Sequence, residues 1–164
     1  MKKNLLFVIL IIFTVSISIN SYASYKGYEE NLGRKGPPPA GPYRLGFKEL
    51  ERAIKTEKKG KVEKAKIKYE KALEYFLKAN VENPADPDIF NYLGICNSKL
   101  GFKENAEIYY LLGLELDDQH NGIKFNLGKF YIEQNRVNDS KEILNTLKNC
   151  DCEEYETLKM IINN

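Results

Sequence analysis

The stretch FNYLGICNSKLGFKENAEIYYLLGLELD, residues 90–117, holds two short amphipathic segments joined by a glycine turn. Gly94 and Ala106 are small, as is needed where the two helices of a hairpin approach each other closely. Gly101 permits a tight turn between them, and Tyr110 is large enough to fill the space between neighbouring hairpins. The spacing therefore predicts an antiparallel helical hairpin.

The same pattern recurs 34 residues later, in the stretch GIKFNLGKFYIEQNRVNDSKEILNTL, residues 122–147. Its small position is occupied by Gly128, and Asn135 stands where the turn glycine is expected. Asparagine also tolerates the left-handed backbone conformation, so the turn is still predicted. A repeat of this length indicates stacked helical hairpins.

An earlier copy of the pattern lies 41 residues before the first stretch. Ala53, Gly60 and Tyr69 take the small, turn and large positions. The seven extra residues fit as about two additional turns on the second helix, because its apolar stripe continues up to Pro84.

Local signals place the helix ends. Asp86, Pro87 and Asp88 are typical of an N-cap, a first-turn proline and an acid at the positive end of a helix dipole. The helix that they start should end near Leu100. The other helices downstream are expected at residues 102–116, 120–134, 137–147 and 153–162, with connections so short that neighbouring helices must run antiparallel.

The stretch 90–117, with its matches at Leu93-Gly94, Gly101, Ala106, Tyr110 and Gly113, resembles a tetratricopeptide repeat (TPR). The resemblance implies an all-α fold of antiparallel helical hairpins stacked as a short superhelix, with about three repeats and a C-terminal capping helix. The whole chain is similar to small exported bacterial TPR proteins. We expect repeats at 46–86, 87–120 and 121–150, and the capping helix at 151–164.

The first residues have the features of a cleavable signal peptide. Lys2 and Lys3 precede an apolar run at residues 5–19, and small residues before Ser24 predict a signal peptide of residues 1–23, cleaved between Ala23 and Ser24. A membrane span needs about 20 apolar residues, more than this run provides. We expect a mature chain without stable membrane insertion, in the periplasm; an N-terminally anchored chain facing the periplasm is the alternative.

Residues 24–45 are rich in glycine and proline and predict a flexible linker. The full chain has 25 basic and 23 acidic side chains, and removal of Lys2 and Lys3 leaves 23 of each. Nucleic-acid binding relies on a basic surface, so nucleic acid is not an expected partner.

In TPR proteins the first helix of each hairpin commonly lines a concave groove that receives a peptide, and the resemblance implies the same groove here. Within it, Asn91 would bond a peptide backbone, Lys129 would pair with an acid, and Ile95 with Phe125 would form an apolar anchor. Helical phase gives the predicted groove residues: Asp88, Asn91, Ile95, Lys99, Phe125, Lys129 and Ile132.

Signals for catalysis are scarce. His120, the only histidine, lies in a predicted turn without a nucleophile elbow, a phosphate loop or metal-ligand spacing nearby. We expect no enzyme activity, no metal and no cofactor. In an oxidising compartment Cys150 and Cys152 would form a disulfide that staples the turn before the capping helix, whereas Cys96 should be buried.

Three functions remain open. The first is a scaffold or adaptor of the cell envelope that binds a protein or peptide in the groove. The second is thiol–disulfide exchange or redox sensing by Cys150 and Cys152, because a bridge between residues two apart is strained. The third is a purely structural array that forms homo-oligomers.

Overall fold

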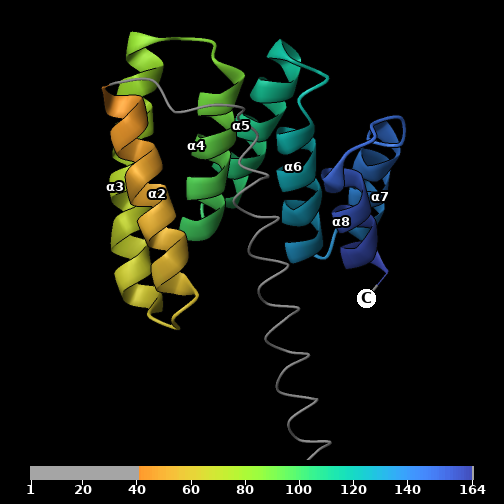
Figure 1. Ribbon diagram of the computed structural model, residues 1–164, viewed down its shortest axis with the longest axis horizontal. Coiled ribbons are helices and arrows are strands. Elements are labelled where there is room, and N and C mark those ends of the chain that lie inside the picture. The colour runs from red at the N-terminus through yellow and green to blue at the C-terminus, as the bar shows by residue number, and fades with distance from the viewer. Residues whose placement is uncertain (1–40, 164) are drawn as a thin grey trace, which may run out of the picture.

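The computed structural model describes residues 41–163, which form seven helices and no strand (Figure 1). The predicted signal peptide, its cleavage site and residues 24–40 of the predicted linker lie outside the described residues. The helices are α2 (Pro42–Glu57), α3 (Val62–Glu82), α4 (Pro87–Leu100), α5 (Lys103–Leu116), α6 (Asn121–Glu133), α7 (Val137–Thr146) and α8 (Glu153–Ile162).

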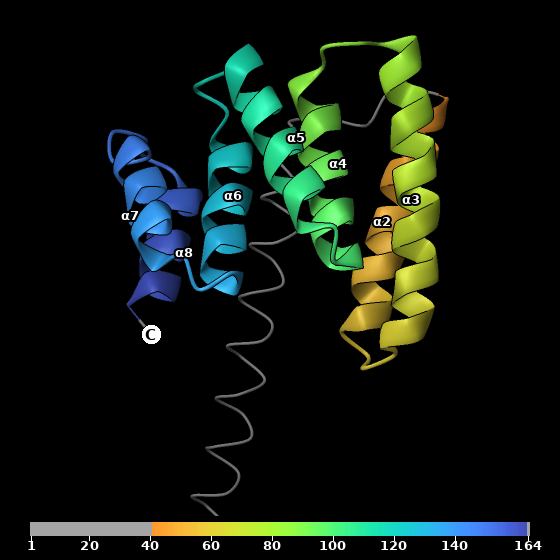
Figure 2. The same ribbon diagram turned by 180° about the vertical axis from the view of Figure 1, so that it is seen from behind.

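Consecutive helices pair as hairpins, α2 with α3, α4 with α5 and α6 with α7. Figure 1 shows α2, α4, α6 and α8 on the side of the molecule that faces the viewer. Figure 2, turned by 180°, shows α3, α5 and α7 in front instead. The hairpins therefore stack in chain order with all first helices on one face, here called the first-helix face, and the predicted all-α array of stacked hairpins is confirmed.

The helix ends follow the local signals in the sequence. The Asp86 carboxylate caps α4 by accepting hydrogen bonds from the backbone N–H groups of Asp88 and Ile89, and Pro87 is the first helical residue. Gly101 ends α4 with φ 85°, and Asn135 takes the same left-handed conformation, φ 59°, after α6. Asparagine thus replaces glycine at this turn, as the repeat predicted.

The first hairpin differs from the other two in length. Helix α3 has 21 residues and α5 has 14, so the seven extra residues lie in α3, as predicted. Helix α2 begins at Pro42, so residues 42–45 belong to a helix and not to the predicted linker. The reason is packing: the ring of Tyr43 is buried against Phe76 and Tyr92, which a linker position would not provide.

One large core joins α2 to α6, and a smaller one lies at the C-terminal end. In the large core the rings of Phe76 and Tyr92 stack with centroids 4.9 Å apart, joining the first hairpin to the second. The smaller core consists of Phe125, Leu147 and Leu158 with partly buried neighbours. None of the helices in residues 41–163 is long and apolar enough to cross a membrane.

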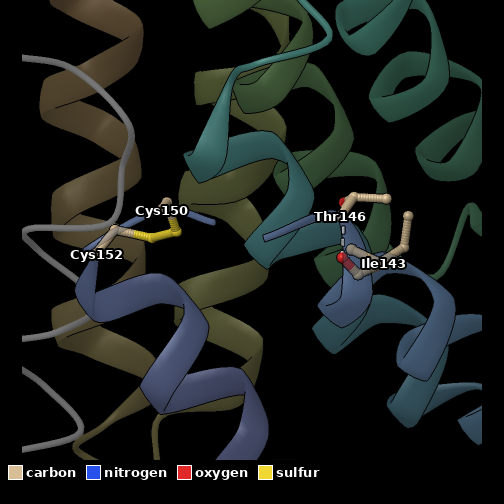
Figure 3. The surroundings of a disulfide bond; sticks show 4 residues. All are labelled: Ile143, Thr146, Cys150 and Cys152. Atoms are coloured by element: carbon tan, nitrogen blue, oxygen red, sulfur yellow. Dashed lines mark hydrogen bonds between the residues drawn. A yellow bond between two sulfur atoms is a disulfide. The ribbon is translucent and has the colours of Figure 1, made fainter. Parts of the chain in front are cut away.

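Helix α8 packs on α6 and α7, in line with the first helices of the three hairpins (Figure 1). A Cβ on Gly128 of α6 would lie 2.6 Å from the Leu158 side chain of α8, so the two helices touch where α6 has no side chain. A disulfide joins Cys150 to Cys152 at the start of α8, with Cα atoms 5.1 Å apart (Figure 3). The bridge closes the turn between α7 and α8.

Candidate functional site

A small pocket lies between α4 and α6, on the first-helix face. Its volume is about 20 Å³, enough for about one water molecule. Tyr110 and Phe130 contribute rings, and the other lining residues are Ile95, Ser98, Lys99, Asn126, Lys129 and Glu133. We call these eight residues the α4–α6 pocket. The structure thus brings together three predicted groove residues, Ile95, Lys99 and Lys129.

The first hairpin contributes a carboxylate beside this pocket. Glu57, the last residue of α2, accepts a hydrogen bond from the Lys99 ammonium at 3.2 Å and another from the Tyr69 hydroxyl at 2.5 Å. Both Glu57 and Lys99 remain partly exposed, so their ion pair contributes little to stability. The ion pair instead joins the end of α2 to α4 and holds the Lys99 ammonium beside the pocket.

Lys129 has an unusual electrostatic environment. Burial lowers its pKa to about 8, and the neighbouring Lys99 acts in the same direction, whereas Glu133 and Glu57 oppose the shift. Its ammonium also lies over the ring of Phe125, 5.2 Å from the centroid. A further carboxylate brought to this place would stabilise the protonated form of Lys129 and raise its pKa.

Four predicted groove residues have other environments. Asn91 is fully buried, and its side-chain oxygen Oδ1 accepts a hydrogen bond from Nδ2 of Asn126 at 3.0 Å. Phe125 is buried, and both it and Ile132 pack in the smaller core with residues of α8. The prediction of groove contacts by Asn91 and Phe125 is therefore corrected: the contacts between α4 and α6, and between α6 and α8, take up these side chains.

Asp88, the fourth, lies at the start of α4 beside His120. The Nδ1 atom of His120 accepts the backbone N–H of Ile123 at 3.1 Å and caps α6, so Nε2 carries the proton toward Asp88 Oδ1, also at 3.1 Å. Both ring nitrogens of His120 therefore have hydrogen-bond partners within the fold. His120 thus aligns the starts of α4 and α6, a role that its position in a predicted turn did not suggest.

Asn126 is the polar pocket residue that the sequence analysis missed. It is buried, and its amide spans from the pocket to Asn91 on the neighbouring helix. The signal was present, because Asn126, Lys129 and Glu133 are spaced three and four residues apart and share one helix face. Helical phase alone could not show how deeply this face of α6 is buried against α4.

Two of the three cysteines form a disulfide, and the third is buried. Cys150 and Cys152 pack beside the smaller core, whereas Cys96 lies in the large core, where burial raises the pKa of its thiol. A buried protonated thiol is unreactive. Within residues 41–163 no group of three His, Cys, Asp or Glu side chains is placed to hold a metal ion.

No family model matches the sequence, and no curated protein matches it either. Solved structures do resemble the fold. The first TPR domain of human RPAP3 superposes with a TM-score of 0.55 at 18% identity, over 75% of this chain and 92% of that domain. The type III secretion translocator chaperone SycD of Yersinia enterocolitica gives a TM-score of 0.52 at 18% identity, over 76% of this chain and 85% of the chaperone.

The Sgt2 TPR domain of Aspergillus fumigatus gives a TM-score of 0.51 at 19% identity, over 78% of this chain and 85% of that one. At sequence identities this low, the similarity is evidence of the fold alone. Together with the three stacked hairpins, they show that the chain has a TPR-like fold.

Proposed function

We propose that this chain is a non-catalytic adaptor that binds a segment of another polypeptide on its first-helix face. The α4–α6 pocket carries this proposal, because it brings two lysines, a glutamate and an amide together beside the rings of Tyr110 and Phe130. Such a mixture suits a peptide, whose backbone needs hydrogen bonds and whose side chains need both apolar and charged partners. The partly desolvated Lys129 favours a peptide with an acidic side chain or carboxylate there.

Solved structures of similar fold support a peptide as the ligand. SycD has been solved in complex with a peptide of the translocator YopD, and the second TPR domain of human RPAP3 in complex with an HSP70 peptide. PcrH has been solved with the chaperone-binding region of PopD. These proteins share the hairpin array and not the sequence, so they support the class of ligand and leave the partner open.

We further propose that the adaptor works in the periplasm after export. The support is the sequence of residues 1–23, with its basic start, apolar run and small residues before Ser24. Intact mass measurement on protein from the source cells tests this proposal. A mass that begins at Ser24 supports it, whereas a full-length, membrane-bound chain would favour the anchored alternative.

The adaptor proposal is tested by placing a photo-crosslinking amino acid at Ser98, on the pocket wall, in living cells of the source organism. We expect one polypeptide to be captured from this site, and its crosslinked segment to bind the purified chain as a synthetic peptide. The variant Lys99→Ala with Lys129→Ala should weaken binding of that peptide by about tenfold or more, because each lost charged contact is worth about 1.5–3 kcal/mol.

The matched control changes Ile67 and Leu77 to Gln, two exposed residues on α3, away from the pocket. This variant should bind the peptide as the wild type does. Capture of the same polypeptide from a crosslinker at Ile67, or equal peptide affinity in the pocket variant, would contradict the proposed site. Melting curves for all variants establish that they are folded.

A further inference from the structure

Helix α5 is apolar on two opposite sides. One side packs into the core through Ala106, Tyr110 and Gly113. The other carries Ile108, Leu111, Leu112 and Leu116, which are 53%, 48%, 38% and 46% exposed. Their spacing of three, four and eight residues from Ile108 puts them on one stripe. We call these four residues the α5 stripe.

The α5 stripe lies on the face opposite the α4–α6 pocket. Figure 2 shows α5 in front of α4 on this face, and no other helix of the described part of the chain crosses over it. The outer side of α3, on the same face, also exposes apolar side chains, Ile67, Leu77 and Val81, but charged residues such as Glu74 and Lys78, which pair at 2.7 Å, lie between them. Scattered apolar residues of this kind are normal on a solvated helix, whereas a continuous apolar stripe like that of α5 marks a surface that another molecule covers.

Charge indicates what kind of molecule covers it. Residues 102–118 contain five acidic side chains and one basic side chain. Glu107 is held by Arg136, whose Nη1 lies 2.8 Å from both carboxylate oxygens. Glu104 and Glu115 are exposed and stand on the same outward side of α5 as Ile108, one at each end of the stripe. Antiparallel pairing of two copies would bring these like charges together, and an anionic lipid surface would be repelled.

We propose that the α5 stripe is a second docking surface, for an amphipathic helix of another protein whose apolar side is flanked by Lys or Arg. The apolar residues would pack between Ile108 and Leu116, a length of about 12 Å or two to three turns of the partner. The flanking cations would meet Glu104 and Glu115. A patch of this size belongs to a transient interface, and its binding falls as salt rises.

The test uses the full chain and a defined probe, an 18-residue amphipathic helical peptide of leucine and lysine with a fluorescent label. Fluorescence anisotropy should show saturable binding that weakens with added salt. The variant Ile108→Gln with Leu112→Gln should bind at least about tenfold more weakly, since two apolar contacts are lost. Glu104→Lys with Glu115→Lys should also weaken binding and flatten its salt dependence.

Matched controls separate this site from general stickiness. Ile67→Gln with Leu77→Gln alters residues that are 55% and 43% exposed on α3 and should leave the affinity unchanged. A peptide with glutamate in place of lysine, and one with the same residues in scrambled order, should bind at least about tenfold more weakly. Lys99→Ala with Lys129→Ala, in the pocket, should have no effect on this probe.

Equal affinity of the α5 and α3 variants, or of the ordered and scrambled peptides, would overturn the proposal. So would a dimer, seen by sedimentation of the full chain alone, that Ile108→Gln with Leu112→Gln abolishes, because the stripe would then belong to a second copy. A failure of the pocket experiment leaves this result unaffected, since the two sites lie on opposite faces and are tested with different ligands.

Discussion

Gly94 of α4 lies directly against the ring of Tyr110 on α5, across the second hairpin. A Cβ at this position would lie 2.5 Å from the Tyr110 ring, well inside van der Waals contact. We predict that Gly94→Ala lowers the free energy of unfolding by roughly 1–3 kcal/mol, the usual cost of overpacking a core. Urea unfolding followed by circular dichroism measures it.

The pair can be isolated with a double-mutant cycle. Tyr110→Leu makes room near Gly94, so Gly94→Ala should cost clearly less in that background than in the wild type. An equal cost in both backgrounds would show that the alanine acts on the helix itself and not through the ring of Tyr110.

Lys129 gives a prediction about pH. Its pKa is about 8 in the folded chain and 10.5 without the protein environment. Below pH 8 both folded and unfolded chains hold the proton, and the cost of burying the charge is fully present. Between pH 8 and 10.5 the unfolded chain binds more protons, so folding stability should rise with pH by an amount on the order of 1–3 kcal/mol.

The measurement compares the wild type with Lys129→Met, which cannot titrate at this position. The difference in unfolding free energy between the two chains should shift in favour of the wild type as the pH rises from 8 to 10.5. NMR titration of the lysine ε-carbon gives the pKa directly. A midpoint near 10.5 would mean that the pocket leaves Lys129 fully solvated.

At the scale of single elements, α8 is the helix that the least packing stabilises. It has ten residues, too few to be stable alone in water, and Leu158 is its one fully buried side chain. The Cys150–Cys152 bridge limits the conformations of the chain just before it. We predict that Cys150→Ser with Cys152→Ser reduces the stability of α8 docking by roughly 1–2 kcal/mol, as expected for so short a loop.

Hydrogen exchange measured by mass spectrometry tests this effect locally. Amides of α8 should exchange faster in the double serine variant, whereas those of α2 to α5 should keep their wild-type rates. Cys96→Ser, a change in the large core, is the contrasting variant, and it should instead lower global stability. Unchanged exchange of α8 in the double serine variant would show that packing on Gly128 holds this helix without the bridge.

On the scale of the whole molecule, each helix contacts only elements near it in the chain, as in other repeat arrays. The two cores differ in size, since the large one joins five helices and the one at the C-terminal end has only three buried side chains. We predict that α7 and α8 open at a lower free energy than α2 to α5. Hydrogen exchange at increasing urea concentration should show two groups of amides; a single common opening would instead indicate one cooperative unit.

Much of the array could be predicted from the sequence, because its causes are local. The positions of Gly94, Gly101 and Asn135, the cap at Asp86 and the shifts of 34 and 41 residues depend on backbone geometry and helical period. They predicted the hairpins, their turns and the longer second helix of the first repeat. The start of α2 was missed because Tyr43 is fixed by rings from two other helices.

Only the tertiary structure decided which side chains are left for a partner. Helical phase put Asn91, Phe125 and Lys129 on one predicted groove, but contacts with α6 and α8 bury the first two and leave Lys129 at a pocket. The same is true of α5. The sequence shows that this helix has two apolar sides, but it does not show which of the two is buried. Burial depends on which helices pack against each other, and that is set by contacts between repeats, beyond the reach of local pattern.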